Sequence, residues 1–225
     1  MGENLTPAVE DYLKTIYELA DDAGRVSTNQ IAERLQVKPA SVTGMLQKMA
    51  QSKPALVDYQ KHHGAALTPA GQVAALEVVR HHRLLELFLQ QALGYSWDQV
   101  HGEADRLEHV ISEDMEERIA QVLGNPARDP HGDPIPTRDF RLPPQSNLRL
   151  CDLRPGQNAR VQRVANTDPE LLRYLSGLGM LPGAQVSILD HSTFDDNLQV
   201  QVQGQGEPIV LGPRVTCQIF MEVQE

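Results

Sequence analysis

Hydrophobic residues recur at helical spacing near the start of the chain. Between Pro7 and Asp21 the apolar positions follow an i, i+4, i+7, i+8, i+11 pattern: Val9, Leu13, Ile16, Tyr17 and Ala20. This pattern predicts an amphipathic helix, with Thr6 as its N-cap and Pro7 in its first turn.

Two shorter helical patterns follow in close succession. The first comes after Ser27 and has Ile31, Ala32 and Leu35 on its apolar side. The second covers residues 38–49, with Val42, Leu46 and Met49 apolar. Helices joined this tightly are typical of a helix-turn-helix. Residues 55–59 then alternate like a strand, and residues 65–67 return after a Lys-His-His-Gly turn. We therefore expect a winged helix-turn-helix DNA-binding domain over residues 1–70.

The pattern over residues 71–124 is helical throughout. Gly94 ends one helix, Ser96 is placed to cap the next, and Ser112 and Gly124 bound the last. Apolar residues at 84, 85, 87, 88 and 89 almost encircle their helix. This is more apolar surface than a small core needs, so we predict a helical dimerisation domain with its interface there.

The last part of the chain changes character twice. Residues 125–147 contain six prolines, which predicts a linker. Residues 148–225 hold short alternating segments at 159–164, 185–189, 198–202 and 209–211, with one helical turn around 169–175. Short strands separated by Gly and Pro turns favour an SH3-like small β-barrel. The predicted fold class is thus mainly α with β, in three domains.

Composition narrows the function. No apolar run approaches the ~18 residues needed to cross a membrane, and the start of the chain does not resemble a secretory leader. The two cysteines, Cys151 and Cys217, are far apart in the sequence, so we expect a reducing cytoplasm and no membrane partner. A net charge of −10 excludes a general nucleic-acid binder. Residues 34–61, however, hold five basic residues against one acidic residue, and we expect DNA contacts only there.

Candidate metal ligands gather near residue 100. On a helix, His101, Asp105, Glu108 and His109 would share one face. His82 and Glu86 are spaced i, i+4 on the preceding helix, and antiparallel packing would bring the two sets together. Nitrogen and oxygen ligands without a thiol suit manganese or iron(II). A single pair of polar residues such as His82 and Glu86 on a helix is usually solvated or part of the core. Because two helices each carry aligned histidine and carboxylate side chains, a metal site is favoured here.

Two other functions agree less well with these residues. A metallohydrolase of the His-x-x-Glu-His type would need histidine at position 105, where Asp105 stands. A winged-helix regulator of a small organic ligand, with purely structural carboxylates, would leave the aligned histidines without a role.

Several spaced motifs resemble the diphtheria-toxin-repressor family of metal-dependent transcription regulators. They are Glu10–Leu19, Ile31–Leu35, Leu67–Gly71, Glu108-His109, Asp129–Pro136 and, similar to the FeoA-type module, Leu175–Gly183. The resemblance implies a primary metal site at Asp11, Asp105, Glu108 and His109. It also implies an ancillary site at His82, Glu86 and His101, with Asp168 or Glu170 as candidate ligands from the C-terminal module.

The same resemblance implies a homodimer that would bind an operator in double-stranded DNA and repress metal-uptake genes. Base-facing positions would be Lys38, Ala40, Ser41 and Gly44. Arg34, Lys48 and Lys61 would contact phosphates.

Two departures bear on the choice of metal. Asp11 and Asp105 stand where the iron-responsive branch has sulfur-bearing residues, which favours Mn²⁺ over Fe²⁺. Lys14 stands where the manganese-responsive branch has a glutamate, and an ammonium cannot bind a cation. We therefore expect manganese-type primary ligands on an iron-type, three-domain body.

Overall fold

The computed structural model describes residues 5–20, 24–165 and 168–223, and it divides into two compact units. One unit comprises Met1–His81, Glu108–Ile111 and Pro136–Arg141. The other comprises His82–Leu107, Ser112–Ile135 and Leu142–Glu225. Among the described residues, no helix combines the length and apolar character that a membrane crossing requires.

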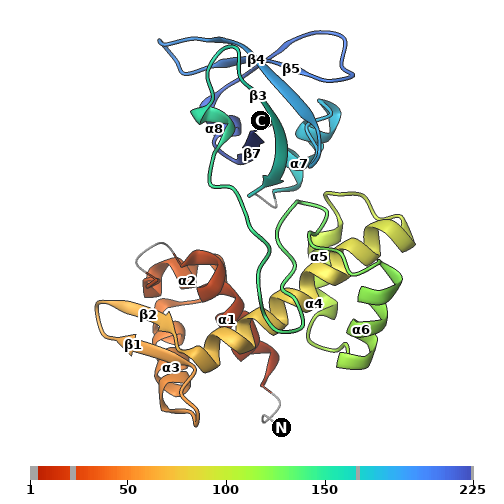
Figure 1. The fold of residues 1–225 in the computed structure, drawn as a ribbon. Coiled ribbons are helices and arrows are strands. Elements are labelled where there is room, and N and C mark those ends of the chain that lie inside the picture. Colours follow the sequence, from red (N-terminus) through yellow and green to blue (C-terminus); the bar gives the residue numbers. More distant parts are fainter. Residues whose placement is uncertain (1–4, 21–23, 166–167, 224–225) are drawn as a thin grey trace. The chain divides into compact units, whose positions relative to one another are not determined.

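The N-terminal part is a winged helix-turn-helix (Figure 1), as the sequence predicts. Its helices are α1 (Pro7–Leu19), α2 (Thr28–Arg34) and α3 (Pro39–Gln51), and its wing pairs β1 (Val57–Gln60) with β2 (Gly64–Leu67) in antiparallel register. A capping box between Ser27 and Gln30 starts α2. The core is formed by apolar side chains from all three helices and the wing, among them Leu13, Ile16, Ile31, Leu46 and Val57.

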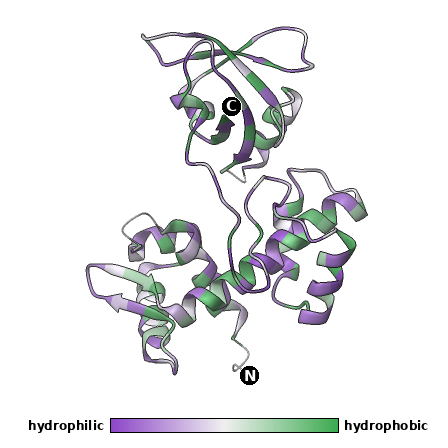
Figure 2. Ribbon diagram, in the orientation of Figure 1, coloured by the Kyte–Doolittle hydropathy of each residue, from purple (hydrophilic) through white to green (hydrophobic). Residues whose placement is uncertain are grey.

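Three further helices follow: α4 (Pro69–Leu93), α5 (Val100–Leu107) and α6 (Glu113–Val122). Ser112 caps α6 as expected, by accepting a hydrogen bond from the Met115 amide. Helices α4 and α6 show both hydrophobic and hydrophilic residues along their lengths (Figure 2), which is typical of helices that bury one face.

Helix α5 is shorter than the sequence predicts. It begins at Val100 rather than after Ser96, and it ends at Leu107. Glu108 and His109 therefore lie in the turn that follows the helix, and the prediction of four ligands on one helix face is wrong. The residues before α5 form a turn because Trp97 packs into the core of the C-terminal β-domain instead of continuing the helix.

The leucines that almost encircle α4 are buried within the single chain. Leu84, Leu85, Leu87 and Leu89 are each at most 6% exposed. The prediction that this stretch forms the dimer interface is therefore wrong for those residues, because the protomer itself covers them. Among the described residues, the larger apolar side chains that remain exposed on or beside α4, α5 and α6 are Val73, Leu93, Tyr95, Val110, Met115 and Val122.

The C-terminal part is a small β-domain, in agreement with the predicted SH3-like fold. Its elements are η1 (Leu150–Asp152), β3 (Asn158–Val164), α7 (Pro169–Gly177), β4 (Gln185–His191), β5 (Leu198–Val202), β6 (Ile209–Leu211), α8 (Pro213–Thr216) and β7 (Ile219–Val223). The five strands form one antiparallel sheet in the order β6-β5-β4-β3-β7. Register shifts in β3 and β4 bend the sheet around a core of aliphatic side chains.

Candidate metal centre

A first cluster of metal-ligand types joins α1 to the turn after α5. The His109 Nε2 atom lies 2.9 Å from Asp11 Oδ1, and its Nδ1 atom lies 2.6 Å from Glu10 Oε2. One ligand atom each from Asp11, Glu108 and His109 lies within 4.8 Å of the other two. Three of the four predicted primary ligands thus come together, and Glu10 joins them.

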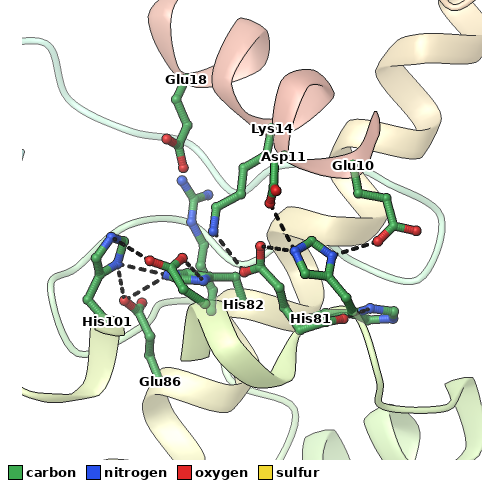
Figure 3. A network of polar contacts seen from close by, with 12 residues as sticks. Glu10, Asp11, Lys14, Glu18, His81, His82, Glu86 and His101 are labelled. Carbon is green, nitrogen blue, oxygen red and sulfur yellow. Dashed lines mark hydrogen bonds and ion pairs between the residues drawn. The ribbon is translucent and has the colours of Figure 1, made fainter. Parts of the chain in front are cut away.

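Lys14 lies at the buried edge of this first cluster. Its ammonium donates a hydrogen bond of 2.7 Å to Glu108 Oε2, and the two side chains are 9% and 1% exposed. One helical turn separates Asp11 from Lys14, so α1 directs an anion and a cation toward the same carboxylate–imidazole group (Figure 3). The sequence indicates that an ammonium at position 14 cannot bind a cation. In the structure this ammonium pairs with the Glu108 carboxylate instead.

A second cluster is formed by α4 and α5. His82 Nε2 lies 3.0 Å from Glu86 Oε1 and 2.9 Å from His101 Nδ1, and that same Nδ1 atom is 3.0 Å from Glu86 Oε1. The three side chains point toward one another (Figure 3), and His82 and Glu86 are buried. These are the predicted ancillary ligands.

Asp105 contacts the second cluster. Its carboxylate oxygens lie 3.4 Å from His82 Nδ1 and 3.7 Å from His101 Nε2. Asp105 follows His101 by one turn of α5, which explains why both reach the same group of imidazoles. Its predicted assignment to the primary site stays a prediction.

The Pro-rich segment before the β-domain adds two buried residues to the second cluster. Ligand atoms of Asp129 and His131 lie within 4.8 Å of one another and of Glu86. The His131 ring stacks on Trp97, and its Nε2 atom lies 3.1 Å from the Trp97 carbonyl oxygen. The same loop contacts β3 of the β-domain, because the Val164 amide donates a hydrogen bond to the His131 carbonyl.

Electrostatics make Glu86 the anionic centre of the second cluster. Burial alone would raise the pKa of Glu86, but the surrounding imidazoles outweigh burial and hold that pKa well below its usual range. Burial, the charge of Glu86 and the charge of Asp133 raise the pKa of Asp129 well above its usual range. Burial would lower the pKa of His131, but the carboxylates of Glu86 and Asp129 raise it.

The two candidate ligands from the C-terminal module, Asp168 and Glu170, lie at the start of α7. Asp168 caps α7 by accepting a hydrogen bond from the Glu170 amide, and both residues are exposed. Within the part of the chain that the structure describes, neither joins a group of three ligand-type residues. Their role in the ancillary site stays a prediction.

Three residues of the two clusters were missed by the sequence prediction: Glu10, Asp129 and His131. Glu10 adjoins Asp11 in the sequence, but neighbouring helical residues point about 100° apart, and only the turn at His109 brings both carboxylates to one imidazole. Asp129 and His131 belong to the Asp129–Pro136 motif, which was the only signal that could have found them.

The donor chemistry fits a divalent transition metal. Both clusters combine imidazole nitrogens with carboxylate oxygens and contain no thiolate, the set that suits manganese, iron(II) or zinc better than a soft ion. Carboxylates next to neutral imidazoles can bind such an ion, because metal ligands must be deprotonated.

The predicted DNA-contacting residues lie on the winged helix and are exposed. Five of them line the start and outer face of α3: Lys38, Ala40, Ser41, Gly44 and Lys48. Arg34 is the last residue of α2, and Lys61 lies in the wing turn. A Cβ atom added at Gly44 would meet nothing within 4 Å, so this position is open. Arg34 forms an ion pair of 3.2 Å with Glu18.

Three family models match successive parts of the chain. Residues 4–65 match the model of the iron dependent repressor N-terminal DNA binding domain, residues 68–137 that repressor's metal binding and dimerisation domain, and residues 148–223 the FeoA domain. The chain is 34% identical over 198 residues to the diphtheria toxin repressor of Corynebacterium efficiens, an alignment that covers 84% of this chain and 85% of the relative.

Solved structures show the same architecture. A manganese-dependent transcriptional repressor in complex with manganese is 37% identical, with a TM-score of 0.87 over 96% of this chain and 100% of the other. The structure of ScaR with bound Zn²⁺ is 33% identical, with a TM-score of 0.78 over 96% and 99%. Members of this group are DNA-binding repressors rather than enzymes. The chain belongs to the diphtheria-toxin-repressor family of metal-dependent transcriptional repressors.

Proposed function

We propose that this protein is a manganese-activated repressor of metal-uptake genes, which acts in the cytoplasm as a homodimer on an operator in double-stranded DNA. The observation that carries the proposal is the pair of sulfur-free carboxylate–imidazole clusters around His109 and Glu86. Hard oxygen donors favour Mn²⁺, and Fe²⁺ is the second candidate.

We assign the first metal to Asp11, Glu108 and His109, with Glu10 and Asp105 as further ligands. His109 lies 2.9 Å from Asp11, and Glu108 is held by the Lys14 ammonium, so each side chain is already oriented by a neighbour. Because Asp11 belongs to α1 of the winged helix, a metal bound here would fix the position of α1 against the 108–111 turn.

We assign the second metal to His82, Glu86 and His101, and add His131 with Asp129 as ligands from the Pro-rich loop. The low pKa of Glu86 supports this assignment, because a carboxylate that stays ionised is ready to bind a cation. Asp168 and Glu170 are kept as candidates from the β-domain, because both are exposed, Asp168 as the N-cap of α7 and Glu170 in its first turn.

We further propose that α3 is the recognition helix. Small residues at its exposed positions, Ala40, Ser41 and Gly44, suit methyl contacts and water-mediated readout of the major groove, with Lys38 beside them. Arg34, Lys48 and Lys61 would hold phosphates, and two recognition helices of a dimer would read half-sites about one helical turn or a multiple apart.

Metal binding by single-site variants tests this assignment. We expect His109→Ala to lose binding at the first site and Glu86→Gln to lose it at the second, each weakening Mn²⁺ binding at its site by at least about 10-fold. Electron paramagnetic resonance of free Mn²⁺ measures both. His191→Ala is the matched control, because His191 lies on β4 beside Asp196 and outside both clusters. Unchanged Mn²⁺ binding by both cluster variants would contradict the proposal.

A further inference from the structure

The β-domain brings its two cysteines to the same end of one strand pairing. Arg149 forms an antiparallel bridge with Phe220, and the Met221 amide donates a hydrogen bond of 2.8 Å to the Leu148 carbonyl. Counting away from this bridge, Cys151 comes two residues after Arg149, and Cys217 comes three before Phe220. Because the two segments run antiparallel, both cysteines lie on the same side of the bridge.

The elements that carry the cysteines also pack together. Cys151 is the middle residue of η1, Cys217 is the C-cap of α8, and η1 contacts both α8 and β7. Both thiols are free and partly exposed. A small oxidant can therefore reach a pair of thiols that the fold has already brought together from positions 66 residues apart in the sequence.

The surroundings of Cys151 oppose the ionisation of its thiol. Burial, then the neighbouring Cys217 thiol and the charge of Asp152, raise the pKa of Cys151 to about 12. Cys151 therefore keeps its proton at neutral pH. Because the thiolate is the attacking form of cysteine, Cys151 is a poor nucleophile, and the first chemical step falls to the other cysteine of the pair, Cys217.

A metal does not account for the pair. Within residues 5–20, 24–165 and 168–223, neither cysteine belongs to a group of three or more His, Cys, Asp or Glu ligands. Two thiols alone fall short of the four ligands of a structural zinc site.

We propose that Cys151 and Cys217 form a reversible redox site, oxidised to an intramolecular disulfide by hydrogen peroxide. The Cys217 thiolate attacks one peroxide oxygen, the O–O bond breaks, and the released hydroxide takes up a proton, which leaves a sulfenic acid and one water. The Cys151 sulfur then attacks the Cys217 sulfur, the S–O bond breaks, and the leaving hydroxide takes the Cys151 proton as a second water. Two thiols are oxidised by two electrons, and one peroxide is reduced to two waters.

The disulfide would close a loop that contains most of the β-domain. It would join η1, at the start of the domain, to the end of α8, just before the last strand β7. Cross-links that close long loops restrict the unfolded chain most, so oxidation would stabilise this domain against unfolding without a new contact elsewhere.

Mass spectrometry of the full chain tests the proposal. After a modest excess of hydrogen peroxide, in the presence of a chelator, we expect the wild type to lose both free thiols and the mass of two hydrogen atoms. Non-reducing digestion should yield one cross-linked peptide pair containing Cys151 and Cys217, and dithiothreitol should restore both thiols. Two free thiols that persist, or a disulfide between two chains on a non-reducing gel, would overturn the proposal.

Single serine variants test the order of the two steps. We expect Cys151→Ser to accumulate a sulfenic acid at Cys217 that dimedone labels. Cys217→Ser should be labelled at Cys151 at least about tenfold more slowly, because Cys151 retains its proton. Equal labelling of the two variants would overturn the assignment of Cys217 as the attacking residue. None of these readouts depends on manganese or DNA, so they are independent of the proposed repressor function.

Discussion

Lys14 is the residue that sets the charge of the first cluster. Three carboxylates, those of Glu10, Asp11 and Glu108, surround His109, and the Lys14 ammonium offsets one of them from within the buried edge. A buried anion that loses its partner is strongly unfavourable, and a bound cation can take over that role.

This balance gives a prediction for Lys14→Met. Without metal, we expect the variant to lose about 3–5 kcal/mol of unfolding free energy, because Glu108 stays buried and loses its ion pair with the Lys14 ammonium. Mn²⁺ should stabilise the variant more than it stabilises the wild type. Chemical denaturation with and without Mn²⁺ measures both effects. Lys48→Met, at an exposed position of α3, is the control, and equal metal-free stability of the two variants would contradict this role of Lys14.

His131 gives a prediction about pH in the metal-free protein. The carboxylates of Glu86 and Asp129 raise its pKa in the folded protein, despite burial. The resulting stabilisation is complete below the unfolded value of about 6.5 and is lost as pH rises through the raised folded pKa. We expect His131→Gln to flatten this loss of stability above about pH 6.5 in denaturation curves. A variant that retains the full wild-type pH dependence would show that another group is responsible.

At the scale of elements, local patterns predicted the helices and strands better than they predicted the clusters. The winged helix was predictable from short-range spacing and helix caps, because its apolar faces and its turn residues indicate the same helix boundaries. Helix α5 was predicted too long because Trp97 is drawn into the β-domain core, a long-range effect that periodicity cannot show. Strand β7 was not predicted, and α7 extends over nine residues rather than one turn.

The clusters depended even more on long-range structure. His82, Glu86 and His101 were predictable because each pair of neighbours is close in the sequence or on adjacent helices. His131 was not, because its contact with Glu86 depends on how the Pro-rich loop folds back. The proximity of Cys151 and Cys217 was not predictable either. The two cysteines are distant in the sequence, and the pairing of Arg149 with Phe220 of β7 brings them together.

The loop that carries His131 depends on one glycine. Gly132 has φ of +89°, and a Cβ atom there would lie 2.0 Å from the Gln162 carbonyl oxygen of β3. We expect Gly132→Ala to cost about 1–3 kcal/mol more unfolding free energy than Gly156→Ala, and to weaken Mn²⁺ binding at the second site. Gly156 is the matched control, because it has φ of +88° but nothing within 4 Å of an added Cβ. Equal costs in thermal unfolding would contradict a close packing of this loop on β3.

At the scale of the whole molecule, the protein confines its DNA-binding charge to one domain. The net charge of −10 opposes general attraction to DNA, while residues 34–61 carry five basic residues and one acidic residue. Affinity for an operator must therefore come from a correctly placed recognition helix rather than from overall charge. To move such a protein from about 1% to 99% in the binding-competent form, the metal must supply roughly 5.5 kcal/mol of differential binding.

Operator binding as a function of manganese is the most direct test of this account. A labelled duplex selected from a random pool in the presence of Mn²⁺ serves as the probe, and fluorescence anisotropy reports binding. We predict that Mn²⁺ tightens binding by at least about 100-fold over a chelator, a difference of about 2.7 kcal/mol. We also predict that His109→Ala abolishes the tightening, whereas His191→Ala preserves it. The same affinity with Mn²⁺ and with chelator in the wild type would contradict the account.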